Sequence, residues 1–158
     1  MANTQSMCTS FMGELMTATH NFGTAPTRGT SAADTFKAAL YLATATVDAS
    51  TTAFSATDEV SGSGYTSGGI AVTNATPPTA TNASATAGVA FFTPSASLVY
   101  TSVTLTTAFD AVLIYNSTQS NKAVSVHTFG SQTITAGTFT LTMPTNNTTD
   151  ALLRLATT

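Results

Sequence analysis

Apolar and polar positions alternate along much of the chain with a period of two. In residues 35–43 (TFKAALYLA), Phe36, Ala38, Leu40 and Leu42 fall on the same side of this alternation. Successive side chains of a β-strand point to opposite faces, so the pattern is typical of a strand with one buried face. We therefore predict that the main body of the protein begins with a strand in this segment.

Six further short segments of this kind follow, with turn-forming residues between them. They are residues 69–75, 88–93, 98–105, 108–116, 123–130 and 138–144. A last apolar segment, residues 151–156 (ALLRLA), is expected to form a short strand or a turn of helix. Regularly spaced strands favour an antiparallel β-sandwich or a jelly-roll-like barrel, here with about seven to eight strands. The predicted fold class is all-β, with a short N-terminal helix or arm.

The N-terminal segment follows a helical pattern instead. Met7, Phe11 and Leu15 recur at helical spacing within residues 6–19, and Ser6 stands where a capping residue is expected. A short amphipathic helix is predicted there. Its apolar side chains either fold back onto the chain's own body or dock onto another protein, and the sequence leaves both alternatives open.

A polar segment separates this helix from the strands. Residues 21–34 (NFGTAPTRGTSAAD) are rich in Gly, Pro, Ser and Thr, which favour loops and linkers. The sequence therefore predicts two parts, an N-terminal arm in residues 1–30 and a β-sandwich domain in residues 31–158.

One pair of strands can be aligned by hypothesis around the loop at residues 116–121 (NSTQSN). If Tyr115 faces Lys122, then Asp110 lies opposite His127. A cross-strand ion pair or hydrogen bond is the simplest role for these two side chains, and a catalytic pair is the alternative.

In the same alignment one face of the hairpin forms the core, with Leu113 opposite Val124 and Ala111 opposite Val126. The opposite face carries apolar side chains among polar ones, which suggests a covering partner or a neighbouring subunit. The candidates for a protein interface are therefore Met7, Phe11 and Leu15 of the helix, and Val112 and Ile114 of this face.

Composition supports the β-rich prediction and narrows the range of partners. Threonine occurs 36 times, whereas charged residues make up only 7% of the chain. Threonine is β-branched and suits a pleated, half-exposed surface. The net charge is −3 with four basic residues, which argues against binding to nucleic acid or to an anionic membrane. We expect no disulfide within the chain, since it has one cysteine.

Residues 59–69 (EVSGSGYTSGG) contain a glycine cluster that invites comparison with phosphate-binding loops. A dinucleotide-binding loop that starts at Gly62 requires glycine where Ser67 stands. A P-loop that starts at Gly64 requires Lys and Ser or Thr where Ile70 and Ala71 stand. We therefore interpret the glycines as a turn with close backbone approach or positive φ, which leads into the next strand.

The sequence offers no clear catalytic or metal-binding constellation. Its two histidines, His20 and His127, lie in different predicted parts, and no nucleophile is placed beside either. Asp58 and Glu59 are adjacent carboxylates that resemble a calcium or sugar site, although a solvated acidic turn is the simpler interpretation. We expect no enzymatic activity, no cofactor and no metal.

Several strings in the chain resemble a group of small virion structural proteins of tailed bacteriophages, related to capsid cement (decoration) proteins. They are TFKAALY (35–41), EVSGSGYTSGG (59–69), AVLIYNST (111–118), NKAVSVHTFG (121–130) and TAGTFTLTMPTN (135–146). The resemblance runs from Thr35 to about Asn146 in the same order. It implies a structural component of the phage particle without catalytic activity.

Within the particle we expect a cement protein on the outside of the capsid that bridges and stabilises the major capsid subunits. The expected partners are the major capsid protein and copies of the chain itself, as a trimer at local three-fold positions. The expected location is the capsid surface, after synthesis in the host bacterial cytoplasm. A tail- or fibre-associated protein is the first alternative. A carbohydrate-binding adhesin that stacks sugars on Tyr65, Tyr100 or Tyr115 is the more distant one.

Overall fold

The structure is a computed structural model that describes residues 3–16, 18–23, 33–81 and 88–156. Its elements are β1 (Ser6–Met7), α1 (Thr9–Met16), β2 (Phe36–Leu42), β3 (Ile70–Val72), β4 (Thr79–Ala80), β5 (Val89–Phe92), β6 (Leu98–Asn116), β7 (Lys122–Leu141) and β8 (Leu153–Ala156). They form a five-stranded sheet in the order β1-β7-β6-β2-β3 and a three-stranded sheet in the order β4-β5-β8. All paired strands are antiparallel, which confirms the all-β prediction, and the sheets do not close into a barrel.

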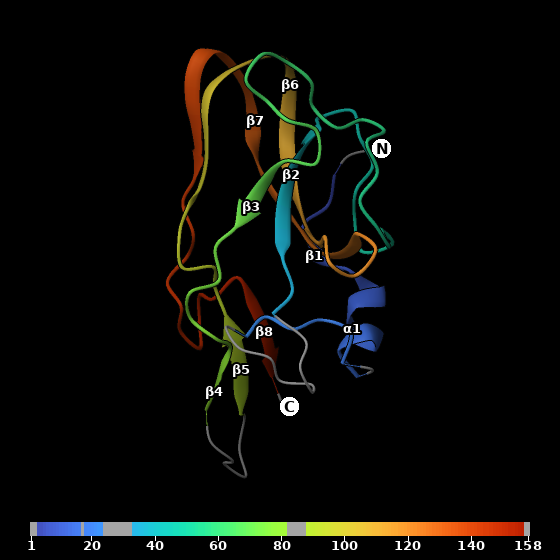
Figure 1. The fold of residues 1–158 in the computed structure, drawn as a ribbon, viewed down its shortest axis with the longest axis vertical. Helices are drawn as coiled ribbons and strands as arrows, with labels where there is room; N and C mark the ends of the chain where they lie inside the picture. The colour runs from blue at the N-terminus through green and yellow to red at the C-terminus, as the bar shows by residue number, and fades with distance from the viewer. Residues whose placement is uncertain (1–2, 17, 24–32, 82–87, 157–158) are drawn as a thin grey trace.

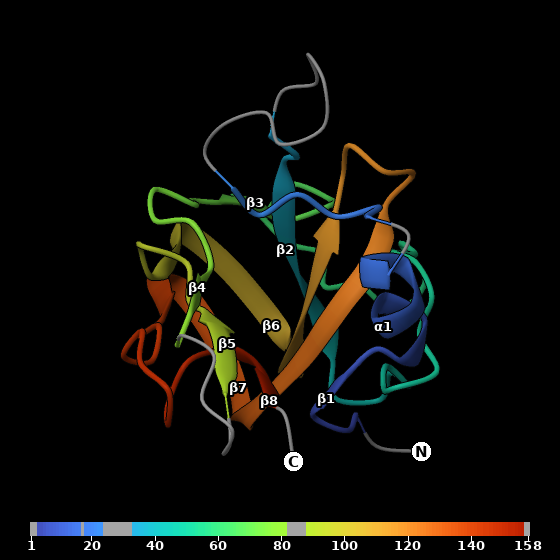
Figure 2. The same cartoon turned by 90° about the horizontal axis from the view of Figure 1, so that it is seen from below.

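The two longest strands, β6 and β7, form a bent ribbon that spans most of the molecule (Figure 1). The sequence predicted four short strands here, and the structure joins them in pairs. The pairing shifts at several β-bulges, and Ser102 and Ala136 have positive φ at this stretch of the ribbon. Bulges bend a strand without ending it. Seen from below, β6 therefore has the shape of a V (Figure 2).

The predicted alignment of this hairpin is shifted by two residues in the structure. Leu113 pairs with Val126 instead of Val124, and His127 pairs with Val112 instead of Asp110. A shift of two residues leaves each side chain on the same face of the sheet. The predicted division into two faces is therefore correct, whereas the pairing of Asp110 with His127 is wrong.

At the end of the ribbon next to its turn, residues 111–116 of β6 and 123–126 of β7 are buried on both faces of the sheet within the chain. Val112 and Ile114 are 2% and 3% exposed, and they line a cavity inside the V. The opposite wall of that cavity contains Leu98 and Leu141, which come from the other end of the same ribbon. The covering layer that the sequence assigned to a partner is therefore supplied by the chain itself.

The glycine cluster before β3 brings the chain close to the backbone of neighbouring strands. A Cβ atom at Gly69 would lie 1.7 Å from the Ala38 carbonyl oxygen, and φ of Gly69 is +71°. A Cβ atom at Gly62 would lie 2.0 Å from the Thr104 carbonyl oxygen. Only glycine permits such approaches. The structural interpretation of residues 59–69 is confirmed.

The N-terminal arm, where it is described, packs on the β-rich body. The helix in the structure, α1, is shorter than the one predicted within residues 6–19. Ser6 belongs to the edge strand β1 and does not cap the helix. The Cys8 N–H donates a hydrogen bond to the Val124 carbonyl, 3.0 Å away, and Phe22 stacks on Phe36 at 4.3 Å between ring centroids.

Across the described ranges, no helix has the length and hydropathy of a transmembrane span.

Candidate functional site

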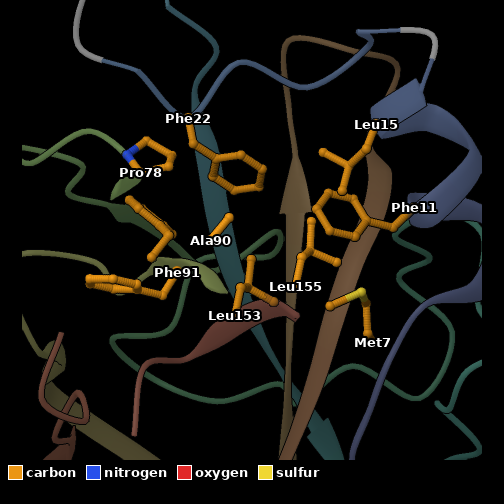
Figure 3. A pocket seen from close by; sticks show the side chains of 10 residues that line it. Met7, Phe11, Leu15, Phe22, Pro78, Ala90, Phe91, Leu153 and Leu155 are labelled. Atoms are coloured by element: carbon orange, nitrogen blue, oxygen red, sulfur yellow. The ribbon is translucent and has the colours of Figure 1, made fainter. Parts of the chain in front are cut away.

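An apolar groove lies between the N-terminal arm and the three-stranded sheet. On the arm side, its wall is formed by Met7 of β1, by Phe11 and Leu15 of α1, and by Phe22. Phe11 and Leu15 are four residues apart, so they lie on the same face of the helix. Figure 3 shows these side chains directed toward the sheet. Three of the five predicted interface residues are thus brought together here.

The opposite wall comes from the sheet, which lies near the lower end of the molecule in Figure 1. Its residues are Pro78, Ala90, Phe91 and Phe92, with Leu153 and Leu155 of β8. In β8, Leu153 and Leu155 are two residues apart and therefore share a face. Their partners in β5 are Phe92 and Ala90, which share that face.

The groove is open to solvent and has a volume of about 120 Å³. An apolar cavity of about 150 Å³ in another protein stays dry and binds benzene, so this space suits one large apolar side chain. Leu155 remains 47% exposed on its wall, whereas Phe11 is almost completely buried. A partner that fills the groove would remove this exposed apolar surface from water.

The sequence did not locate the sheet side of the groove. The local pattern that could have indicated it is the spacing of Leu153 and Leu155 in ALLRLA, which fits one face of a strand. The pairing of this segment with residues 89–92 joins parts of the chain that are far apart, and no local pattern specifies that pairing. Val112 and Ile114, the remaining predicted interface residues, lie inside the V and do not line the groove.

A polar network fastens the helix side of the groove to the body. Glu14 of α1 accepts hydrogen bonds from Lys122 at 2.6 Å and from the buried ring of His20 at 2.7 Å. The Asn116 side-chain amide lies 3.1 Å from the other ring nitrogen of His20. An amide nitrogen can only donate, so this contact places the ring proton on Nε2, which faces Glu14.

Asp34 continues the network at the entry to β2. It accepts hydrogen bonds from the Asn116 side chain, the Asn21 backbone N–H and the Gln119 side chain. Burial alone raises the pKa of a carboxyl group, but here the hydrogen bonds outweigh it and the pKa of Asp34 is lowered. The pKa of Glu14 is lowered in the same way, because Lys122 and His20 outweigh its burial.

Asp110 and His127, the possible catalytic pair of the sequence analysis, contact different partners. Asp110 accepts a hydrogen bond from Asn3, whereas His127 contacts the Ser125 hydroxyl at 2.9 Å. Burial, and then Asp48 and Glu14, raise the pKa of the Cys8 thiol to about 11, which keeps it protonated at neutral pH. In the described part of the chain, no three His, Cys, Asp or Glu side chains are grouped as metal ligands.

The acidic pair Asp58 and Glu59 does not form an open site for calcium or sugar. Glu59 is buried and accepts hydrogen bonds from the Tyr65 hydroxyl, the Ser67 hydroxyl and the Gly68 N–H, at 2.6 to 2.7 Å. Burial, and then Glu59, raise the pKa of Tyr65. This carboxylate holds the glycine cluster in shape. The solvated turn expected from the sequence is therefore wrong for Glu59, which is buried.

The tyrosines proposed as sugar platforms are occupied within the fold. Tyr100 and Tyr115 are buried, and their hydroxyls donate to the Ala38 and Gly68 carbonyls. Tyr65 is half-buried, and its hydroxyl is bound by Glu59. Tyr65 and Tyr100 also line a second hollow of about 260 Å³, whose lining mixes polar and apolar residues, whereas every residue that lines the groove is apolar.

Comparison with protein-family models finds no match to this chain, and neither curated proteins nor solved structures match it significantly.

Proposed function

We propose that this chain is a structural protein of a tailed-bacteriophage particle, and that it acts as a capsid cement protein on the outside of the major capsid shell. The strings in residues 59–69 and 121–130 support the phage assignment by resemblance. The observation that carries a binding role is the open apolar groove between α1 and β8. The proposed partners are the major capsid protein and further copies of the chain, assembled as a trimer.

The groove is well suited to an assembly role because it is formed before any partner arrives. The network around Glu14 and Asp34 fixes the arm against the body, and Phe11 is anchored in the core. A preformed site has less conformational entropy to lose when it binds. Binding at each of many equivalent sites then adds to the cohesion of the shell.

The proposal is tested on purified phage particles with and without this protein. Complete particles should contain it in amounts comparable with the major capsid protein, as measured by densitometry of a stained gel. Particles that lack it should release DNA at a lower temperature, and purified protein added back should restore the original temperature. Equal release temperatures contradict the cement role.

The same gel distinguishes the alternative location in the tail. A tail or fibre component is present in far fewer copies than the major capsid protein. A low copy number together with labelling at the tail in immunoelectron microscopy would replace the cement assignment with the tail assignment.

A further inference from the structure

We propose that the groove binds an extended, uncharged segment of a partner protein, which pairs with the free edge of β8 and inserts one large apolar side chain between Leu155 and Phe11. This inference rests on the proposed function, in which the groove is a protein-binding surface, and it names the mode of recognition. The mode is the addition of a strand to an existing sheet.

The first observation is the position of β8 in its sheet. β8 pairs with β5 on one side and is the last strand on the other, so its outer edge has no strand partner among the described residues. In both Figure 1 and Figure 2, α1 lies beyond this outer edge, on the side away from β5. An exposed strand edge offers unpaired N–H and C=O groups to another extended chain. Here that edge adjoins the groove.

The second observation is the chemistry of the walls. All residues that line the groove are apolar, and Arg154 of β8 has its side chain bound to the Thr149 carbonyl at 2.8 Å. A charged group in the groove would lose its hydration without gaining a partner, at a large cost. The inserted side chain is therefore apolar, of the size of leucine, isoleucine, methionine or phenylalanine.

The third observation is the size of the site. A volume of about 120 Å³ accommodates one such side chain, and β8 is four residues long. A bound helix normally uses several anchors spaced three, four and seven residues apart, which requires a longer groove. An extended segment needs only alternate side chains and a short edge, which is what β8 and Leu155 provide.

The test uses the whole chain, labelled with ¹⁵N, and three synthetic heptapeptides observed by NMR. The first peptide alternates threonine with valine and has leucine at its centre. The second has aspartate at the centre. The third has the side chains of the first but carries an N-methyl group on every backbone nitrogen, which removes the N–H donors from both edges of the peptide. The first peptide should shift the amide signals of residues 153–156 and slow their hydrogen exchange.

The two other peptides separate side-chain insertion from backbone pairing. Aspartate at the centre should weaken binding by about tenfold or more, the loss typical of an interface anchor. The N-methylated peptide should bind at least as weakly. Equal binding of the N-methylated peptide would overturn strand pairing, and equal binding of the aspartate peptide would overturn insertion into the groove.

Two variants of the chain provide matched controls. L155D and the milder L155A should weaken binding of the first peptide, and circular dichroism checks that each variant is folded. V99D places the same charge at a residue that is 42% exposed and lies outside the groove, so it should bind the peptide normally. Equal binding by all three variants would overturn the inference.

Failure of this inference differs from failure of the proposed function. If no peptide binds while the protein still raises the DNA-release temperature of phage particles, the strand-pairing inference is wrong and the cement role stands. Self-association of the free protein that L155D and L155A abolish would show that a second copy occupies the groove, which also overturns the inference. Sedimentation equilibrium measures that association.

Discussion

The ammonium of Lys122 lies 2.6 Å from Glu14, and this ion pair joins the helix α1 to the first residue of β7. The other oxygen of Glu14 contacts the buried His20 ring. One carboxylate therefore connects three parts of the chain: the helix, the segment that follows it and the β6–β7 hairpin. The groove wall carried by α1 depends on this connection.

Replacing Glu14 should destabilise the protein more than replacing Lys122. E14Q should lower the free energy of unfolding by about 1.5–3 kcal/mol, because hydrogen bonds to charged groups contribute about that much. K122M should cost less than about 1 kcal/mol, since the Lys122 side chain is 40% exposed and exposed ion pairs are weak. Urea unfolding followed by circular dichroism measures both values. Equal losses from the two variants would show that the contact between Glu14 and His20 adds little to stability.

Gly69 should tolerate no side chain. G69A would place a methyl group against the Ala38 carbonyl oxygen, in a backbone conformation that favours glycine. We expect a loss of about 3 kcal/mol or more in the free energy of unfolding. G130A is the control, because a Cβ atom there has no neighbour within 4 Å. A G69A protein as stable as G130A would show that the close approach is not required.

The stability of the protein should depend on pH through His127. Burial lowers the pKa of His127 to about 4, from its usual value near 6.5. Between these values the unfolded chain binds a proton that the folded chain does not, so stability increases with pH in this window. The contribution of neutral His127 to the free energy of unfolding is fully present above about pH 6.5. The free energy of unfolding falls by about 3 kcal/mol as the pH decreases to 4.

The variant H127Q should abolish this part of the pH dependence. Urea unfolding at a series of pH values between 4 and 7 measures the slope for both proteins. The lowered pKa values of Glu14 and Asp34 add a further loss at lower pH, and that loss should persist in the variant. An unchanged slope between pH 4 and 6.5 in H127Q would refute the assignment.

Val112 should behave as a core residue of the single chain. V112A should lower the free energy of unfolding by about 2 kcal/mol, through lost burial and the space left behind. V99A removes the same atoms from an exposed position and should change stability by less than about 0.5 kcal/mol. Thermal unfolding at several protein concentrations measures both. A V112A defect that appears only at concentrations where the protein self-associates would instead place Val112 at an interface.

Much of the fold follows from local patterns in the sequence. The alternation in residues 35–43 predicted β2 to within one residue at each end. The period of two in the later segments assigned Leu113 and Val126 to the same face of the hairpin. The helical spacing of Phe11 and Leu15 predicted the face of α1 that lines the groove, whereas Met7, which was predicted on the same helix, lies in β1. These features depend on neighbouring residues, so a local pattern is sufficient to specify them.

The features that the sequence missed depend on distant parts of the chain. The joining of four predicted strands into β6 and β7 requires bulges near Ser102, and the bend that they allow is fixed by packing across the V. The burial of His20 by Glu14 and Asn116 likewise depends on segments that meet only in the folded state. Periodicity alone contains no information about such contacts.

The bent ribbon also has a consequence for how fast the protein folds. Its turn at residues 117–121 is local, but its far end pairs Leu98 with Leu141, and β2 must join before the five-stranded sheet is complete. Closing such long loops costs entropy before any contact compensates for it. Proteins dominated by pairings of this kind fold in milliseconds to seconds. We expect the hairpin to close first at Asn116 and Lys122, and the ends of the V to meet last.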